Sequence, residues 1–203
     1  MKPLIALDAD GVLLDYNQAY AGAWERAFGV RPALRDPNAY WPLDRWNVER
    51  LAGTKLDQFR TCLDWTFWST VPALPGAREA CERLVAAGYR LVCVSAIRAE
   101  FAEARRRNLE ALGFPLEDFV ATGNAGGDVS PKAAALQRLR PMAFVDDYLP
   151  YHRGVDPSIH KALIRREPNG SPSHGPELTD LDSTHDRLDD FTEYWLGRFH
   201  RID

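Results

Sequence analysis

The sequence contains few cysteines, and they follow no recognisable pattern. Its 203 residues include three cysteines, Cys62, Cys81 and Cys93, which are odd in number and lack any C-x-x-C spacing. This distribution argues against a disulfide framework and against a zinc site, and it favours reduced thiols of the kind kept in a cytoplasm. Cys93 lies in an apolar run, so we expect a small core residue there rather than a nucleophile.

Long apolar runs and an excess of basic residues are also absent. No stretch approaches the roughly 18 apolar residues of a membrane span, and the N-terminus lacks a signal-peptide pattern. The formal net charge of -4 argues against a nucleic-acid partner, which usually requires a basic face. We therefore expect a cytoplasmic protein that binds neither membrane nor nucleic acid, and the sequence leaves its oligomeric state open. The run Arg105-Arg106-Arg107 is expected to be a solvated helix face.

Continuous apolar runs that end in polar residues mark the strands. Continuous rather than alternating hydrophobicity is typical of strands covered on both faces, as in a parallel sheet. Three such runs, with the polar residue after each, are residues 4–7 before Asp8, 91–94 before Ser95, and 142–145 before Asp146. Shorter runs at 119–121 and 162–164 predict two further strands.

Helical patterns lie between these runs. Apolar residues at helical spacing predict helices that end before Gly88 and before Gly113, and a third begins at Ser130 with Pro131 at its first position. A terminal helix is expected over 187–199. The alternation of strands and helices predicts an α/β fold with a Rossmann-like, mainly parallel sheet.

Residues 16–70 interrupt this alternation. They show no convincing strand and contain five of the six tryptophans. We expect helices over 16–28, 45–51 and 55–68, with Asp15 as the N-cap of the first. The chain would then consist of an α/β core (1–15 and 71–203) and a small α-helical cap (16–70). Most of the cap aromatics are expected to form its own small core, although some could stack on a substrate.

Four polar residues should meet at one edge of the sheet. Ligands of an open parallel sheet bind outside the carboxyl ends of its strands, where Asp8, Ser95 and Asp146 are expected. Lys132 continues the buried stripe of its helix at the N-terminal end, so its ammonium needs an acidic partner. Clustered carboxylates with no histidine or cysteine nearby are the ligands that Mg²⁺ prefers. The residues alone therefore indicate a phosphate site bridged by Mg²⁺.

The order of these residues resembles a known family. The segments LDADGVLLD, VSA at 94–96, SPK at 130–132 and FVDD at 144–147 resemble the four motifs of the haloacid dehalogenase superfamily, in that family's order. The insertion after the first segment is where one class of the family carries a mobile helical cap. The resemblance implies a phosphohydrolase that acts on a small phosphorylated metabolite, such as a sugar phosphate or a nucleotide.

The resemblance also implies catalytic and phosphate-binding roles. Asp8 would attack the phosphoryl group to form an aspartyl phosphate, and Asp10 would protonate the leaving oxygen and then activate water. Ser95, with Ala96 beside it, and Lys132 would bind the phosphoryl oxygens. Alanine at 96 is a departure, because many relatives have a polar residue there.

The metal ligands implied by the resemblance are acidic. Mg²⁺ would be bound by the carboxylate of Asp8, the backbone carbonyl of Asp10 and the doublet Asp146-Asp147. The doublet does not decide which of its two carboxylates binds directly, and we expect Asp146.

Several alternatives remain open. The superfamily's dehalogenases dispense with metal and lack the second aspartate of the first motif, so Asp10 argues against that chemistry. A phosphonate-cleaving enzyme would need a cap lysine, and Lys55 is more simply a solvated side chain. A silent binding or regulatory module would not need both Asp8 and Asp10, and a receiver domain would have its phosphorylated aspartate where this chain has Ser95.

Three further residues lie near the expected site. Arg98 could contact a second anion of the substrate or simply begin a surface helix. His152 and His160 are expected to be solvated loop residues, and they are given no role.

Overall fold

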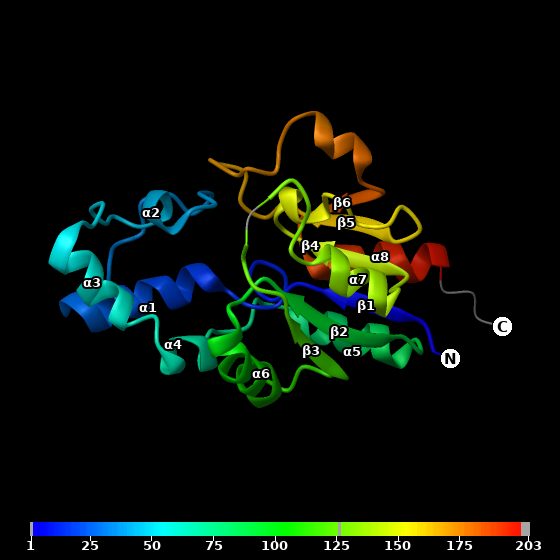
Figure 1. Ribbon diagram of the computed structural model, residues 1–203, viewed down its shortest axis with the longest axis horizontal. Coiled ribbons are helices and arrows are strands. Elements are labelled where there is room, and N and C mark those ends of the chain that lie inside the picture. The colour runs from blue at the N-terminus through cyan, green and yellow to red at the C-terminus, as the bar shows by residue number, and fades with distance from the viewer. Residues whose placement is uncertain (1, 126, 200–203) are drawn as a thin grey trace.

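The computed structural model describes residues 2–125 and 127–199, which form a six-stranded parallel sheet flanked by helices (Figure 1). The strand order is β3-β2-β1-β4-β5-β6. The strands are β1 (Leu4–Leu7), β2 (Arg90–Ser95), β3 (Asp118–Ala121), β4 (Ala143–Asp146), β5 (His160–Ile164) and β6 (Ser183–His185). All neighbouring strands pair in parallel. The Rossmann-like α/β prediction is confirmed.

The five expected strands are present within one or two residues of their predicted bounds, but β6 was missed. It is a three-residue edge strand of Ser183, Thr184 and His185, and none of these side chains is buried. A short polar edge strand has no apolar run by which the sequence could reveal it.

Helices cover both faces of the sheet. Because side chains alternate along a strand, Ile5 and Leu7 of β1 face one apolar cluster, while Ala6 faces the other. The first cluster includes residues of α5 (Ala77–Ala86), α6 (Ala102–Ala111) and α8 (Leu188–Phe199), and the second includes residues of α7 (Ala133–Leu139). Buried Cys93 belongs to the first cluster, as expected of a core residue. The short 3₁₀ helices of the described residues are η1 (Ala99–Phe101), η2 (Leu149–His152) and η3 (Pro176–Asp180).

The insertion forms four helices, which lie to one side of the sheet (Figure 1). They are α1 (Tyr16–Phe28), α2 (Pro42–Arg45), α3 (Gly53–Thr61) and α4 (Trp65–Ser69). Asp15 caps α1 as expected, because its carboxylate accepts a hydrogen bond from the Gln18 amide at 3.0 Å. Aromatic residues, among them Trp24 and Trp46, form a buried cluster inside the insertion.

Two expected helices of the insertion differ from the structure. The helix over 45–51 is wrong, because Trp46 pairs with Leu34 in an isolated bridge and its indole donates to the Asn17 carbonyl at 3.0 Å. The helix over 55–68 is two helices, separated where Asp64 caps α4 through the Phe67 amide at 2.9 Å. In both places a specific hydrogen bond overrides the helical pattern.

The two chain crossings between core and insertion lie side by side. Leu14 pairs with Ala73 in an antiparallel bridge, and the Asp15 amide donates to the Pro72 carbonyl at 2.8 Å. The chain therefore enters and leaves the insertion at one place, directly after the loop that follows β1.

The loop between β5 and β6 makes a second connection to the insertion. Asn169 exchanges backbone hydrogen bonds with Asn38 (3.0 Å) and Tyr40 (2.9 Å). Arg45 of α2 lies 3.3 Å from the carboxylate of Glu167. In Figure 1 this loop, drawn in orange, reaches toward α2. Within the described residues, no helix combines the length and apolarity needed to span a bilayer.

Candidate active site

The loop after β1 holds two aspartates against the neighbouring strand β4. The Asp8 amide donates to the Val145 carbonyl at 2.9 Å, which continues the β1–β4 pairing to the end of the strand. Gly11 follows with a φ of 83°, a left-handed conformation that favours glycine. A Cβ at this position would lie 2.1 Å from the carboxylate of Asp147. Gly11 thus allows the β1 loop to approach Asp147 closely.

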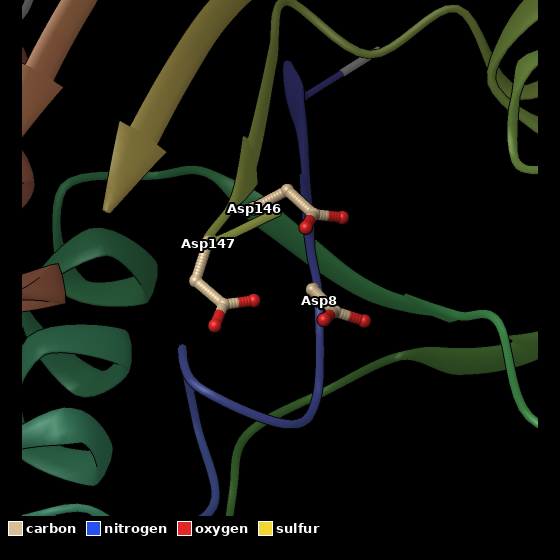
Figure 2. A group of neighbouring side chains, drawn as sticks. All are labelled: Asp8, Asp146 and Asp147. Carbon is tan, nitrogen blue, oxygen red and sulfur yellow. The ribbon is translucent and has the colours of Figure 1, made fainter. Parts of the chain in front are cut away.

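Three carboxylates gather at the carboxyl ends of β1 and β4, where the strand order reverses. Asp8, Asp146 and Asp147 each offer an oxygen within 4.8 Å of the others. Figure 2 shows these side chains beside one another, with the carboxylate of Asp147 directed toward Asp8. This is the edge at which open parallel sheets bind their ligands.

Lys132 lies between two of these carboxylates. Its ammonium is 2.6 Å from Asp8 Oδ1 and 2.5 Å from Asp146 Oδ2, and its side chain is fully buried. Burial alone would lower the pKa of Lys132, but Asp146 and Asp8 more than offset this and raise it. The ammonium therefore stays charged. The structure brings Lys132 to the place that its helical stripe predicts, although the assigned helix begins at Ala133 rather than at Pro131.

Asp10 is held by an arginine that the sequence analysis placed in solvent. Arg105 Nη2 donates to both carboxylate oxygens of Asp10, at 2.8 and 2.9 Å, and the Arg105 side chain is fully buried. Arg106 and Arg107 are exposed, so the expected solvated face holds for two of the three arginines. Arg105 occupies the same helix face as buried Leu109, four residues later, and that spacing was a usable signal.

Burial and mutual repulsion perturb the acidic groups. Burial raises the pKa of Asp8 to about 6, with Asp146 adding to the rise and Lys132 opposing it. Burial, with the neighbouring Asp146 and Asp8, holds the pKa of Asp147 well above its ordinary value. Burial also raises the pKa of Asp10, although Arg105 opposes the rise. The cluster thus holds more negative charge than its single lysine balances.

This donor set fits a hard divalent cation. Three carboxylates with no sulfur or imidazole ligand match the oxygen coordination of Mg²⁺. Both oxygens of Asp146 already accept hydrogen bonds, one from Lys132 and one from the Tyr148 amide at 2.9 Å. Asp147 faces the loop of Gly11 instead.

A cavity of about 470 Å³ opens above Asp8. Ser95, which is buried, and Ala96 line it, as do Asp10 and Asp147. Five of the predicted site residues therefore face a common space, and Lys132 lies behind Asp8 in ion-pair contact with it.

Other residues singled out in the sequence lie elsewhere. Arg98 is exposed and pairs with Glu100, and Lys55 is exposed and pairs with Glu49. The solvated position expected for His152 is wrong: it is buried against Phe144, and burial lowers its pKa to about 3.

His160 also differs from expectation. It is only partly exposed and packs against Trp195 of α8 at a ring distance of 5.2 Å. The sequence around these histidines has no periodic pattern, so the burial of His152 and the packing of His160 could not be predicted.

A parallel sheet with aspartates and a buried lysine where its strand order reverses is an α/β fold with a ligand site at the expected edge. The chain belongs to the haloacid dehalogenase-like hydrolase family, whose model matches residues 2–149. The matched region contains both strands that carry the acidic cluster, and Lys132. The family prediction made from the four motifs is confirmed.

Solved structures show the same fold at low sequence identity. A haloacid dehalogenase-like hydrolase from Streptococcus pneumoniae is 16% identical, with a TM-score of 0.64 over 96% of this chain and 98% of that one. A family hydrolase from Deinococcus radiodurans R1, with bound phosphate and sodium, is 16% identical, with a TM-score of 0.63 over 97% and 96%.

A dehalogenase has the same fold as well. L-2-haloacid dehalogenase from Xanthobacter autotrophicus, with chloropropionic acid covalently bound, is 13% identical, with a TM-score of 0.60 over 99% and 100%. A search of curated proteins by sequence found no match. The fold is therefore shared with enzymes of different chemistry, and the side chains of the site must distinguish between them.

Proposed function

We propose that the protein is a Mg²⁺-dependent phosphomonoesterase that forms an aspartyl phosphate on Asp8. One observation carries the proposal: the Lys132 ammonium lies within 2.6 Å of both Asp8 and Asp146, beside a third carboxylate at the same strand edge. This arrangement provides a nucleophile, a fixed positive charge and a set of oxygen ligands for a divalent cation.

Each site residue has a separate role in the proposed reaction. Asp8 attacks phosphorus, and the bond between phosphorus and the ester oxygen breaks. Asp10 gives its proton to the leaving oxygen and afterwards takes one from the water that hydrolyses the aspartyl phosphate. Ser95 and the backbone at Ala96 bind phosphoryl oxygens, and Lys132 supplies positive charge beside them.

The cation would be held by Asp8, the Asp10 carbonyl and the Asp146-Asp147 doublet. A cation bound there would neutralise negative charge on the phosphoryl oxygens of the substrate. We assign the direct contact to Asp147, because both oxygens of Asp146 already accept hydrogen bonds. This reverses the preference for Asp146 that the sequence alone gave.

A screen of phosphate esters with and without Mg²⁺ tests the proposal. We expect the protein to release phosphate from an aryl phosphate and from a set of metabolite phosphates. EDTA should remove this activity, because the acidic cluster repels the substrate phosphate unless a cation neutralises it. Adding Mg²⁺ in excess should restore it.

A dehalogenase is the second candidate, since enzymes of that chemistry share the fold. Chloride release from 2-chloropropionate, measured in the same EDTA-treated protein, separates the two. Chloride release without metal and without any phosphate release would contradict the proposal. The exposed position of Lys55, with its ammonium 2.6 Å from Glu49, offers no support for phosphonate cleavage.

Arg105 is expected to act as a positioning residue for Asp10. In the Arg105→Met variant, kcat/KM for an alkyl phosphate should fall about tenfold or more, because that leaving group needs a well-placed proton donor. The value for p-nitrophenyl phosphate, whose leaving group needs little protonation, should change much less. Steady-state kinetics with the two esters measure the difference.

The matched control for this change is Arg107→Met on the same helix. Arg107 is exposed and contacts Glu103 at 2.9 Å, so neither ester should be affected. An equal loss for both esters in Arg105→Met would indicate general damage to the fold rather than a misplaced Asp10, and would reject the positioning role.

A further inference from the structure

The cavity above Asp8 is larger than a phosphoryl group requires. Its volume of about 470 Å³ lies within the usual range for small-molecule sites, roughly 300–1,000 Å³. The catalytic residues form only its floor. The remaining walls, which would surround the leaving group of the substrate, come mainly from the insertion and from the segments that follow β4 and β5, with Ile97 and Asn124 contributed by the segments after β2 and β3.

These walls are rich in aromatic side chains. The aromatic lining residues are Tyr16, Tyr40, Trp41, Trp68, Tyr148 and Tyr151. Trp68 is already stacked on Phe101, with ring centroids 5.5 Å apart. Trp41 contacts Tyr40 edge-on at 4.9 Å, and 44% of its surface is exposed.

Trp41 is accessible from two sides. It also lines an adjoining cavity of about 710 Å³ inside the insertion, together with Tyr16 and Pro42. Part of its large ring is thus exposed in the wall of the catalytic cavity and available for stacking. A flat ring is the partner that such a surface binds best.

The charges of the cavity favour a neutral leaving group. Among the described residues that line it, Arg166 is the only cation. Its guanidinium lies 2.6 Å from Glu167, which also pairs with Arg45. A substrate that carries a second anionic group besides its phosphoryl group, such as a carboxylate or another phosphate, would meet no unpaired positive charge there. Arg98, the sequence-based candidate for such a contact, is not among the lining residues.

Amide side chains complete the wall. Asn17 lines the cavity and is 95% buried, and its Oδ1 has no hydrogen-bond partner within the described part of the chain. Asn124 also lines the cavity. Amide side chains that share a cavity with an aromatic ring are groups with which proteins bind the polar edge of a nucleobase.

We infer that the substrate is a nucleoside monophosphate whose base stacks on Trp41. The inference rests on the proposed phosphatase function and specifies its leaving group. Attack by Asp8 breaks the bond between phosphorus and the nucleoside oxygen, which takes a proton from Asp10. Water then releases inorganic phosphate from Asp8, so the products are a nucleoside and phosphate.

The experiment compares esters that share the same reacting centre. Ribose 5-phosphate has the phosphate and sugar of a nucleoside 5′-monophosphate but no base. We expect kcat/KM of the wild-type protein to be at least about tenfold higher for one or more nucleoside 5′-monophosphates, in line with the strength of base stacking on aromatic side chains. Trp41→Ala should remove this preference, so that the ratio of kcat/KM for the nucleotide to that for ribose 5-phosphate falls to about one. Trp41→Phe should retain most of the preference.

The control is Trp65→Ala. Trp65 belongs to the same insertion and is 45% exposed, but it does not line the cavity. Its replacement should leave the preference intact. Calorimetric titration of the Asp8→Asn variant with nucleoside monophosphates and Mg²⁺ adds a measurement that needs no turnover, and Trp41→Ala in that background should weaken binding at least about tenfold.

The outcomes separate the two proposals. Hydrolysis of nucleotides and ribose 5-phosphate at equal rates, or hydrolysis of other phosphates alone, would overturn the nucleotide inference and leave the phosphatase function standing. A failure to hydrolyse any phosphate ester would overturn the proposed function itself. A preference for nucleotides that persists in Trp41→Ala would reject the stacking role of Trp41.

Discussion

Replacing Asp8 with asparagine is expected to reduce phosphate release by roughly 10³-fold or more, the scale seen when a covalent nucleophile is removed. The amide has nearly the size of the carboxylate but is neutral and cannot form the aspartyl phosphate. Asp8 is also one of three crowded carboxylates, so the change removes repulsion with Asp146 and Asp147 while Lys132 keeps its bond to Asp146. The variant should therefore fold. Phosphate release under saturating Mg²⁺, with circular dichroism for folding, measures both effects.

Asp15→Asn is the control for the loss of an acid close to the site. Asp15 caps α1, and asparagine caps helices nearly as well, so turnover and stability should change little. Substantial activity in Asp8→Asn, with Asp15→Asn also active, would show that Asp8 is not the nucleophile and would refute the proposed mechanism.

Replacing Lys132 with methionine is expected to impair both stability and turnover. The side chains of Lys132 and Asp146 are fully buried. The change therefore leaves the carboxylates of Asp8 and Asp146 close together without a counter-charge. Removing one partner of a buried ion pair costs about 3–5 kcal/mol of folding free energy. Turnover should fall roughly 10²-fold or more, because a fixed charge beside the phosphoryl group is lost. Urea unfolding and phosphate release measure the two losses.

The stability loss in Lys132→Met should depend on pH and on Mg²⁺. The folded-state pKa of Asp8 is already raised to about 6, and removal of Lys132 raises it further. A carboxyl whose pKa is higher in the folded state destabilises the fold when it ionises. Relative to wild type, this part of the deficit should therefore be small below about pH 6, where Asp8 is protonated in both folded proteins, and should grow as the pH rises above about 6.

Mg²⁺ is expected to reduce the same deficit, because the cluster without its lysine carries one more uncompensated negative charge and should bind the cation more tightly than the wild-type cluster does. The control is Lys55→Met, which removes an exposed lysine paired with Glu49 and should change stability by less than about 1 kcal/mol. A Lys132→Met variant as stable as wild type at pH 8 would contradict the role of this lysine as the counter-charge of the cluster.

The meeting of Asp8, Asp146 and Lys132 at one site could be predicted, because it follows from the order of the strands and from helical spacing. Asp8 follows β1 and Asp146 ends β4 of the same parallel sheet, and Lys132 lies four residues before buried Leu136. These relations depend only on strand and helix geometry. The same rule, applied to Arg105 and Leu109, would have identified the partner of Asp10. The run of three arginines was instead interpreted as a solvated helix face, which is correct only for its other two members, Arg106 and Arg107.

The parts that could not be predicted depend on tertiary contacts. The indole of Trp46 donates to a carbonyl 29 residues away, and this contact replaces an expected helix turn. His152 is buried by the packing of η2 on Phe144, which no local pattern encodes. The choice between Asp146 and Asp147 depends on which oxygens accept hydrogen bonds, and only the folded chain determines that.

The loop between β5 and β6 joins the insertion to the acidic cluster. Besides its bonds to the insertion, it reaches back to the cluster, where the Ser173 hydroxyl donates to the Asp147 carbonyl at 2.9 Å and accepts from the Leu149 amide at 3.1 Å. Any displacement of the insertion relative to the sheet would therefore strain a segment that also supports the backbone of Asp147, the proposed metal ligand. Under the proposed function, the position of the insertion and the geometry of the metal site would be coupled through this one loop.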